Sequence, residues 1–286
     1  KDKYKFPMFT SCCPGWIRFI KTQYPDMLEN LSTAKSPHQM FGAIMKTYFA
    51  EKLGVDPSRL FVISIMPCIA KKSECDIPVM QNENGVRDVD LVLTTRELDR
   101  MIKAENIDVF TLTDSEFDRP FEAASGAGVI FGATGGVMEA ALRSAYFLIT
   151  GTNADADAFS GVRGMDGWKE AEFEINGLKV RAAVASGLGN ARRLIEAVRA
   201  GKVQYDFVEI MACPGGCSGG GGQPIAFNKE LAEERAENLY FLDKSAPLRF
   251  SHENPDVKKL YENFLGEPLS HKSHELLHTE YTSWKV

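Results

Sequence analysis

A pair of cysteines inside a glycine-rich stretch places the strongest constraint on how this chain can fold. Cys213 and Cys217 are separated by Pro-Gly-Gly, and four consecutive glycines follow at positions 219–222. Glycine lets the backbone approach a bound group closely, because it has no Cβ atom. Two thiols at this spacing can reach one metal centre, although a paired core or redox role is also compatible with the spacing. The other cysteines must decide between these interpretations.

The cysteines are few and fall into separated groups. Six in 286 residues are too few for a disulfide scaffold, and they stand at positions 12 and 13, 68 and 75, and 213 and 217. This grouping is typical of metal chemistry in a reducing compartment, which predicts a cytoplasmic protein. Four thiolates from such loops would suit zinc or an iron–sulfur cluster. A structural zinc site usually uses two C-x2-C pairs, and the sequence has none, which disfavours zinc.

Charge and hydropathy exclude some partners. A formal net charge of −6 offers no broad basic surface for nucleic acid. No apolar run reaches the roughly 18 residues that a membrane span requires, so we expect a soluble protein. The first residue is Lys and no signal pattern follows it, which we interpret as the start of a fragment of a longer chain.

Apolar patterning predicts an α/β body. Residues 60–66 are almost all apolar, which is typical of a strand buried on both faces of a helix-covered parallel sheet. Cys68 follows this strand, at the end where α/β proteins gather their ligand sites. A second strand is expected at 89–94, followed by a helix at 95–103.

The second half of the chain predicts further strands and then only helices. Residues 168–175 and 178–186 alternate in hydropathy around Asn176-Gly177, the strongest short hairpin signal. A helix at 190–200 and a strand at 205–211 then lead to Cys213. Amphipathic helices are expected at 231–243, 255–265 and 270–281, as a tail wrapped around the body.

A glycine-rich stretch at 125–136 precedes a strong helix former. A phosphate-cradling loop is conceivable, but the spacing matches neither the P-loop nor the dinucleotide-binding pattern. We therefore favour a tight helix entry against a neighbouring element.

Three long motifs carry a family resemblance. Residues 10–16 (TSCCPGW), 66–74 (MPCIAKKSE) and 209–217 (EIMACPGGC) resemble the signature motifs of the iron-only (FeFe) hydrogenases, in family order. Residues 125–144 are also similar, and the tail resembles a segment that some members carry as a separate small subunit. The resemblance implies an N-terminally incomplete H-cluster catalytic domain at 1–224 and a small-subunit-like tail at 225–286. The expected fold is α/β in two lobes, each with a small helix-flanked sheet, with the cluster between them and a C-terminal helical wrap.

The resemblance also implies roles for single residues. It assigns Cys217 to the thiolate that bridges a 4Fe–4S cubane and a two-iron subcluster with CO, cyanide and a bridging azadithiolate. It assigns Cys12 to a thiol that exchanges protons with the azadithiolate amine, and Ser32 to a later step of the proton relay. It assigns Lys71 to a lysine that donates a hydrogen bond to a cyanide ligand. The implied cubane ligands are Cys13, Cys68, Cys213 and Cys217, and the implied apolar pocket walls are Met66, Pro67, Phe131 and Met211.

Plainer interpretations compete for several of these residues. Lys71 and Lys72 together would usually be a solvated pair, and Ser32 is also a candidate N-cap of a short helix at 32–35. Glu74 is either a partner of the site or an ordinary salt-bridge residue. Cys75 matches no ligand. Three tail histidines, at 271, 274 and 278, have helical spacing for a metal, but we favour surface or packing roles for them.

The sequence departs from the family pattern in three respects. Relatives continue upstream of residue 10 with one pocket wall and a relay glutamate, so we expect the side chains near Met66, Phe131 and Met211 to be open to solvent here. No C-x2-C-x2-C run is present, which places any further iron–sulfur relay upstream or in another subunit. His38 stands where relatives often have Gln.

The implied function is reversible oxidation of dihydrogen to protons and electrons, with ferredoxin or a similar carrier as electron partner. Two alternatives stay open: a non-catalytic relative that acts in iron–sulfur assembly or sensing, and a structural cluster subunit of an electron-transfer complex. Cys12 argues against the first, because such relatives usually lack that thiol.

Overall fold

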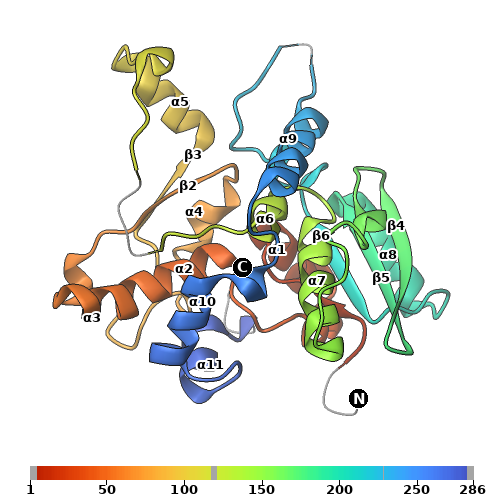
Figure 1. The fold of residues 1–286 in the computed structure, drawn as a ribbon. Helices are drawn as coiled ribbons and strands as arrows, with labels where there is room; N and C mark the ends of the chain where they lie inside the picture. The colour runs from red at the N-terminus through yellow and green to blue at the C-terminus, as the bar shows by residue number, and fades with distance from the viewer. Residues whose placement is uncertain (1–4, 117–120, 228, 282–286) are drawn as a thin grey trace.

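The structure is a computed structural model that describes residues 5–116, 121–227 and 229–281. Within these ranges the fold is α/β with two small sheets that lie apart, as predicted (Figure 1). The larger sheet has the order β1-β6-β5-β4, formed by β1 (Met8–Phe9), β6 (Phe207–Met211), β5 (Leu178–Ser186) and β4 (Trp168–Ile175). Strands β1 and β5 run parallel to β6, and β4 is antiparallel to β5.

The β4–β5 hairpin confirms the turn read from the sequence. Asn176 and Gly177 have φ angles of 50° and 77°, the left-handed conformations that a two-residue turn of this kind needs. Pairing runs without interruption from Ile175–Leu178 to Trp168–Ala185.

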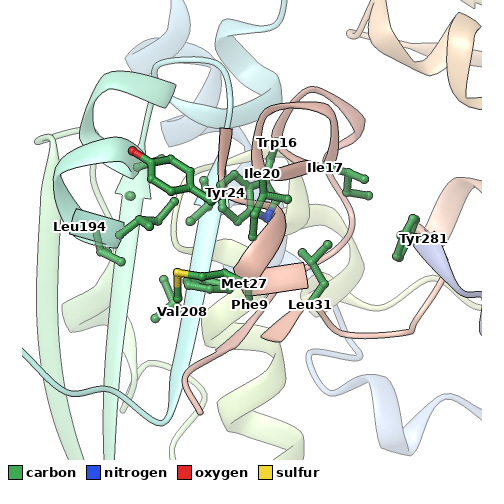
Figure 2. Packing of buried hydrophobic residues seen from close by; sticks show 14 of the residues in the cluster. Phe9, Trp16, Ile17, Ile20, Tyr24, Met27, Leu31, Leu194, Val208 and Tyr281 are labelled. Carbon is green, nitrogen blue, oxygen red and sulfur yellow. The ribbon is translucent and has the colours of Figure 1, made fainter. Parts of the chain in front are cut away.

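Alternate residues of β5 face two different helical layers. Ala183 and Ala185 pack in the largest core cluster, with side chains of α1 (Pro14–Gln23) and α8 (Leu188–Arg199). Ala182 and Val184 belong to a second cluster, formed with α7 (Gly136–Thr150). Because successive strand residues point to opposite faces, the larger sheet is covered on both sides. Figure 2 shows the first cluster, which includes Trp16 and Ile20 of α1, Leu194 of α8 and Val208 of β6.

The smaller sheet corrects one expectation. Strand β2 (Ile63–Met66) pairs in parallel with β3 (Leu91–Thr94), and α5 (Thr95–Ala104) follows from a capping box between Thr94 and Glu97. However, β2 is not buried on both faces, since Ile63 and Ile65 are 53% and 51% exposed. The reason is that the described residues cover only one face of this sheet.

The tail is mainly helical, as predicted, and packs along the body, but the helix expected at 270–281 ends at Leu277 and His278 is extended. Helix α9 (Ala232–Ser245) contacts α6 (Gly126–Val129), and α11 (His271–Leu277) contacts α2 (Pro37–Ile44). The remaining helices are α3 (Ala50–Leu53), α4 (Ala70–Glu74) and α10 (Pro255–Leu260), with π turns at Met45–Phe49 and Tyr261–Leu265. Within the described ranges, no helix is both long and apolar enough to cross a membrane.

A buried network of charges joins the tail to the body. Arg143 of α7 is fully buried and donates to both carboxylate oxygens of Asp243 in α9, at 2.9 and 2.8 Å, and to Glu139 at 2.6 Å. Arg163 binds Glu139 and Asp157, and Arg249 binds Asp157 and Asp243. The three carboxylates lie close enough together to hold a metal ion. Since three guanidinium groups already share them, we assign this cluster to tail docking.

We expect Asp243→Asn to lower the free energy of unfolding by about 1.5–3 kcal/mol, because it removes one of the two carboxylate partners of Arg143 and of Arg249. Urea unfolding measures the loss. Glu237→Gln, at an exposed position of the same helix, is the control and should change stability by less than about 0.5 kcal/mol. Equal small effects of the two substitutions would contradict the docking role.

Candidate metal centre

The three cysteine loops meet between the two sheets. Cys12 and Cys13 follow β1, Cys213 follows β6, and Cys68 follows β2. Since β1 and β6 are parallel neighbours, their carboxyl ends lie at the same edge of the larger sheet. The glycine run after Cys217 then reaches the smaller sheet, where the Gly222 N–H donates to the Pro67 carbonyl at 3.0 Å.

Close backbone packing explains why this run is glycine. A Cβ atom at Gly220 would lie 2.0 Å from the Pro67 oxygen, and one at Gly216 would lie 2.8 Å from the Thr134 nitrogen. Gly216 also has a φ of 79°, which favours glycine. The run therefore brings the loops of Cys217 and Cys68 together.

Burial and neighbouring thiols raise the pKa values of Cys68, Cys213 and Cys217. Burial raises the pKa of Cys217 to about 12, and the nearby charges of Cys13 and Cys68 add to this effect. Burial and Cys13 likewise raise the pKa of Cys213 and of Cys68. Four sulfur donors that repel one another in this way suit a cationic centre, which binds them as thiolates and releases their protons.

The spacing of the donors favours a cluster over a single ion. Among the described residues, one group of metal-ligating side chains has its ligand atoms close enough together for one ion. This group is the arginine-bound Glu139, Asp157 and Asp243, and it includes no cysteine. No three sulfur atoms of the described cysteines therefore lie within 4.8 Å of one another, which disfavours a single zinc ion. The backbone amides of Ala70 and Lys71 lower the pKa of Cys68, and that of Gly221 lowers the pKa of Cys213, in each case against the effect of burial. Soft sulfur donors whose thiolate forms are favoured in this way fit an iron–sulfur group.

The Cys12 thiol differs from its neighbours in its surroundings. Burial, followed by the charges of Cys13, Glu209 and Cys217, holds the pKa of Cys12 well above its usual range, while Lys71 acts in the opposite direction. The thiol therefore keeps its proton at neutral pH when the site holds no cation.

Lys71 is a buried cation, not a solvated one. Its side chain is 5% exposed, and its ammonium donates to Glu74 at 3.0 and 2.9 Å and to the Cys12 carbonyl at 3.1 Å. Burial would lower the pKa of Lys71, but Glu74 and the thiols of Cys12 and Cys217 raise it above its usual value. The lysine therefore brings a positive charge to the cysteine loops.

Glu74 is the partner of this lysine and the centre of a buried network. The Glu74 carboxylate also accepts from Ser36 at 3.0 Å and faces His38 Nδ1 at 3.1 Å, and His38 Nε2 lies 2.7 Å from Ser64 Oγ. Burial raises the pKa of Glu74, but Lys71 and His38 bring it below its usual value, so the carboxylate is ionised. His38 thus acts on the site through Glu74.

The apolar residues of the candidate pocket lie at the ends of strands. Met66 ends β2 and Met211 ends β6, and Pro67 and Cys217 line a cavity of about 340 Å³ that Arg235 and Leu239 of α9 complete. Phe131 packs beside Ile130 in a small cluster. The expectation that Met211 is open to solvent is wrong, since it is 2% exposed within the larger sheet.

Ser32 lies beside the cysteine loops, in an extended segment. Its amide donates to the Phe9 carbonyl at 2.8 Å, and its hydroxyl accepts from the Ala34 amide at 3.2 Å. The helix considered at 32–35 is not formed, because Leu31 and Ala34 make β-bridges. In the described part of the chain, no hydrogen bond joins the Ser32 hydroxyl to the Cys12 thiol.

Residues left outside the candidate centre have packing roles. Cys75 is buried and donates to the Lys71 carbonyl at 3.4 Å. His278 stacks on His274, with ring centres 4.6 Å apart, and its Nδ1 lies 2.9 Å from Thr33 Oγ1, whereas His271 is 96% exposed.

Glu209 is a site residue that the sequence reading missed. Its fully buried carboxylate accepts from the N–H groups of Gly135 and Met138, each at 2.7 Å, at the start of α7. Burial raises the pKa of Glu209 to about 7, against the lowering effect of these N–H groups. The acidic group at this glycine-rich helix start is thus the chain's own carboxyl. The tight helix entry that we favoured from the sequence is confirmed, since a Cβ atom at Gly135 would lie 2.2 Å from the Val162 carbonyl oxygen. The signal in the sequence was Glu209 itself, an acidic residue in the largely apolar strand predicted at 205–211.

Glu209→Gln should remove one pH-dependent component of stability. A carboxyl with a pKa of about 7 when folded, and 4.5 ordinarily, binds more protons in the folded state between these values. Wild-type stability should therefore fall as pH rises from about 4.5 to about 7, by at most about 1.4 kcal/mol per pH unit. Urea unfolding across this range should show a shallower slope for the variant. Glu51→Gln, at an exposed position of α3, is the control, and a wild-type slope in Glu209→Gln would refute the assignment.

Family models match nearly the whole chain. A model described as "Iron only hydrogenase large subunit, C-terminal domain" matches residues 1–221. One described as "Iron hydrogenase small subunit" matches residues 229–284.

Curated relatives include both hydrogenases and assembly factors. The chain is 54% identical to "NADP-reducing hydrogenase subunit HndD" of Solidesulfovibrio fructosivorans, over 97% of this chain and 47% of that protein. It is 47% identical to "Iron hydrogenase 1" of Clostridium pasteurianum, over 96% of this chain and 49% of that protein. It is also 33% identical to "Cytosolic Fe-S cluster assembly factor narfl" of Xenopus tropicalis, over 98% and 60% respectively. The chain thus spans about half the length of the hydrogenases it matches.

A solved structure shares the fold. An apo [FeFe]-hydrogenase HydA1 variant from Chlamydomonas reinhardtii superposes with a TM-score of 0.85 at 46% identity, covering 97% of this chain and 76% of that one.

Proposed function

Because the chain belongs to the iron-only hydrogenase family, we propose that it holds an H-cluster and catalyses the reversible oxidation of dihydrogen to protons and electrons. The observation that carries this proposal is the convergence of four half-buried cysteines from three loops beside a further thiol, Cys12. When bound, the cofactor supplies Lewis-acidic iron and an adjacent amine base, which the splitting of dihydrogen requires.

Four cysteines hold the cofactor in this proposal. Cys13, Cys68, Cys213 and Cys217 would be the 4Fe–4S ligands, and Cys217 would also hold the diiron subcluster that carries the CO, cyanide and azadithiolate ligands. The mutual electrostatic effects of these thiols, and the backbone amides that lower the pKa values of Cys68 and Cys213, support the assignment.

Protons leave the site through the chain's own side chains. Cys12 Sγ takes up and returns the proton, and Ser32 passes it on. The nearby Lys71 ammonium supports this role, because it lowers the pKa of the Cys12 thiol against the effect of burial, and a proton-transfer group works best when its pKa lies near the operating pH.

Lys71 and the apolar side chains shape the pocket. The Lys71 ammonium, held by Glu74, donates to a cyanide ligand as a charge-assisted hydrogen bond. Met66, Pro67, Phe131 and Met211 exclude water and retain the subcluster.

The wider assignments are proposals of the same kind. We assign residues 1–224 to the catalytic domain and 225–286 to the small-subunit-like tail. The substrates are dihydrogen and protons, and the electron partners are further iron–sulfur centres in the protein or its subunits, together with ferredoxin or a similar carrier. The six free cysteines support a cytoplasmic location.

A role in cluster assembly is the second candidate, favoured by the 33% identity to the Xenopus assembly factor along 98% of this chain. Infrared bands from metal-bound CO and cyanide in the matured protein distinguish the two, since a protein that holds only ordinary iron–sulfur clusters has none.

We expect Cys12→Ser to keep the infrared bands of the matured protein but to lose most of the turnover, because a hydroxyl is too weak an acid to relay protons at neutral pH. Hydrogen evolution with a reduced electron carrier measures the loss. Cys75→Ser, which changes a packing thiol, should keep both bands and turnover. Normal turnover in a fully matured Cys12→Ser protein would remove Cys12 from the relay.

Cys217→Ala should lose the CO and cyanide bands completely, because the proposed bridge to the diiron subcluster needs this thiolate. Infrared spectra and iron content after maturation measure the loss, and Cys75→Ala is the matched control. Bands of wild-type intensity in Cys217→Ala would assign the bridge to another residue.

A further inference from the structure

The end of the described tail adds an extended segment to the loop that carries Ser32. The Lys35 amide donates to the Leu277 carbonyl and the Thr279 amide donates to the Thr33 carbonyl, each at 2.8 Å. Between these bonds, Ala34 and His278 form an antiparallel bridge. The tail therefore holds one side of residues 31–35.

The cysteine loop holds the other side of the same segment. Leu31 forms a parallel bridge with Phe9, just before the loop of Cys12. The Ser11 hydroxyl then donates to the Ala34 carbonyl at 2.6 Å. Residues 31–35 thus lie between the cysteine loop and the tail.

Tyr281 is where these three segments meet. Its hydroxyl lies 3.3 Å from the Ser11 carbonyl and 3.0 Å from the Ala34 carbonyl, so one O–H donor serves two acceptors on different loops. Ser11 directly precedes Cys12, and Ala34 is two residues after Ser32. The Tyr281 side chain is 5% exposed and belongs to the largest core cluster, where Figure 2 shows it beyond Ile17 and Leu31.

We propose that Tyr281 is a positioning residue, whose hydroxyl fixes the separation between the loop of Cys12 and the loop of Ser32. This inference rests on the proton relay of the proposed function. Proton transfer depends steeply on the distances between successive donors and acceptors, so a tie between the two loops acts on the relay without contact to the cofactor. The tail then sets the geometry of the relay.

A pure packing role is the competing interpretation, because the tyrosine ring lies in the core. Tyr281→Phe separates the two, since it keeps the ring and removes the donor. Tyr24→Phe is the matched control: Tyr24 is 4% exposed in the same core cluster, but its hydroxyl bonds to Glu196 of α8 at 3.2 Å.

The first measurement is amide hydrogen exchange over residues 31–35 in the matured protein. Loss of one buried hydrogen bond should speed exchange of the Ser32 and Lys35 amides about three- to tenfold in Tyr281→Phe. Tyr24→Phe should leave these amides at the wild-type rate. Equal exchange in the two variants would overturn the tie between the loops.

The second measurement is hydrogen evolution in water and in deuterium oxide. Tyr281→Phe should lower kcat several-fold and raise the solvent isotope effect, while KM for the electron carrier and the CO and cyanide bands stay unchanged. Wild-type kcat with faster exchange would overturn the positioning role.

The two proposals fail separately. A wild-type protein without CO and cyanide bands after maturation would refute the hydrogenase assignment and, with it, the relay role of Tyr281. Wild-type bands and turnover together with identical kinetics of Tyr281→Phe and Tyr24→Phe would refute the Tyr281 inference alone.

Discussion

The candidate centre depends on one close backbone contact between two parts of the chain that lie far apart in sequence. The Gly222 amide bonds to the Pro67 carbonyl, and Gly220 packs against the same oxygen at a distance that excludes any Cβ atom. This contact joins the loop that follows the larger sheet to the loop that follows the smaller one. Together with the Arg96 amide, which donates to the Gly222 carbonyl at 2.9 Å, it holds the loop of Cys217 beside the loop of Cys68.

Burial of charge is the second constraint, and the chain meets it in two ways. Near the thiols, single groups are offset by close partners: Glu74 holds Lys71, and backbone N–H groups hold Glu209. These surroundings shift the pKa values of Lys71, Glu74 and Glu209, because burial disfavours the charged form of each group, whereas a nearby opposite charge or N–H donor favours it. Away from the thiols, Arg143 and its partners balance three carboxylates with three guanidinium groups. That network joins the tail to the body.

The tail is consequently more than a cover. Asp243 ties α9 to the helix whose start holds Glu209, and Tyr281 reaches the backbone next to Cys12. Both ends of the tail therefore contact elements that carry the candidate centre. The tail also completes the cavity that Cys217 lines, through Arg235 and Leu239.

Local signals in the sequence by themselves determined the hairpin at Asn176-Gly177, the helix start at Thr94, the helical tail and the cysteine-rich motifs, because each depends on neighbouring residues alone. The ligand roles drawn from the motifs remain predictions. Only the tertiary structure decided that one face of β2 is open, that Met211 is buried, that Glu209 lies at the start of α7, and that Tyr281 contacts the Ser11 and Ala34 carbonyls. These outcomes depend on which distant segment packs against a residue. An apolar strand has the same sequence pattern whether or not a helix covers it. The hydroxyl of Tyr281 acquires its hydrogen-bond partners only when residues 11, 34 and 281 are brought together.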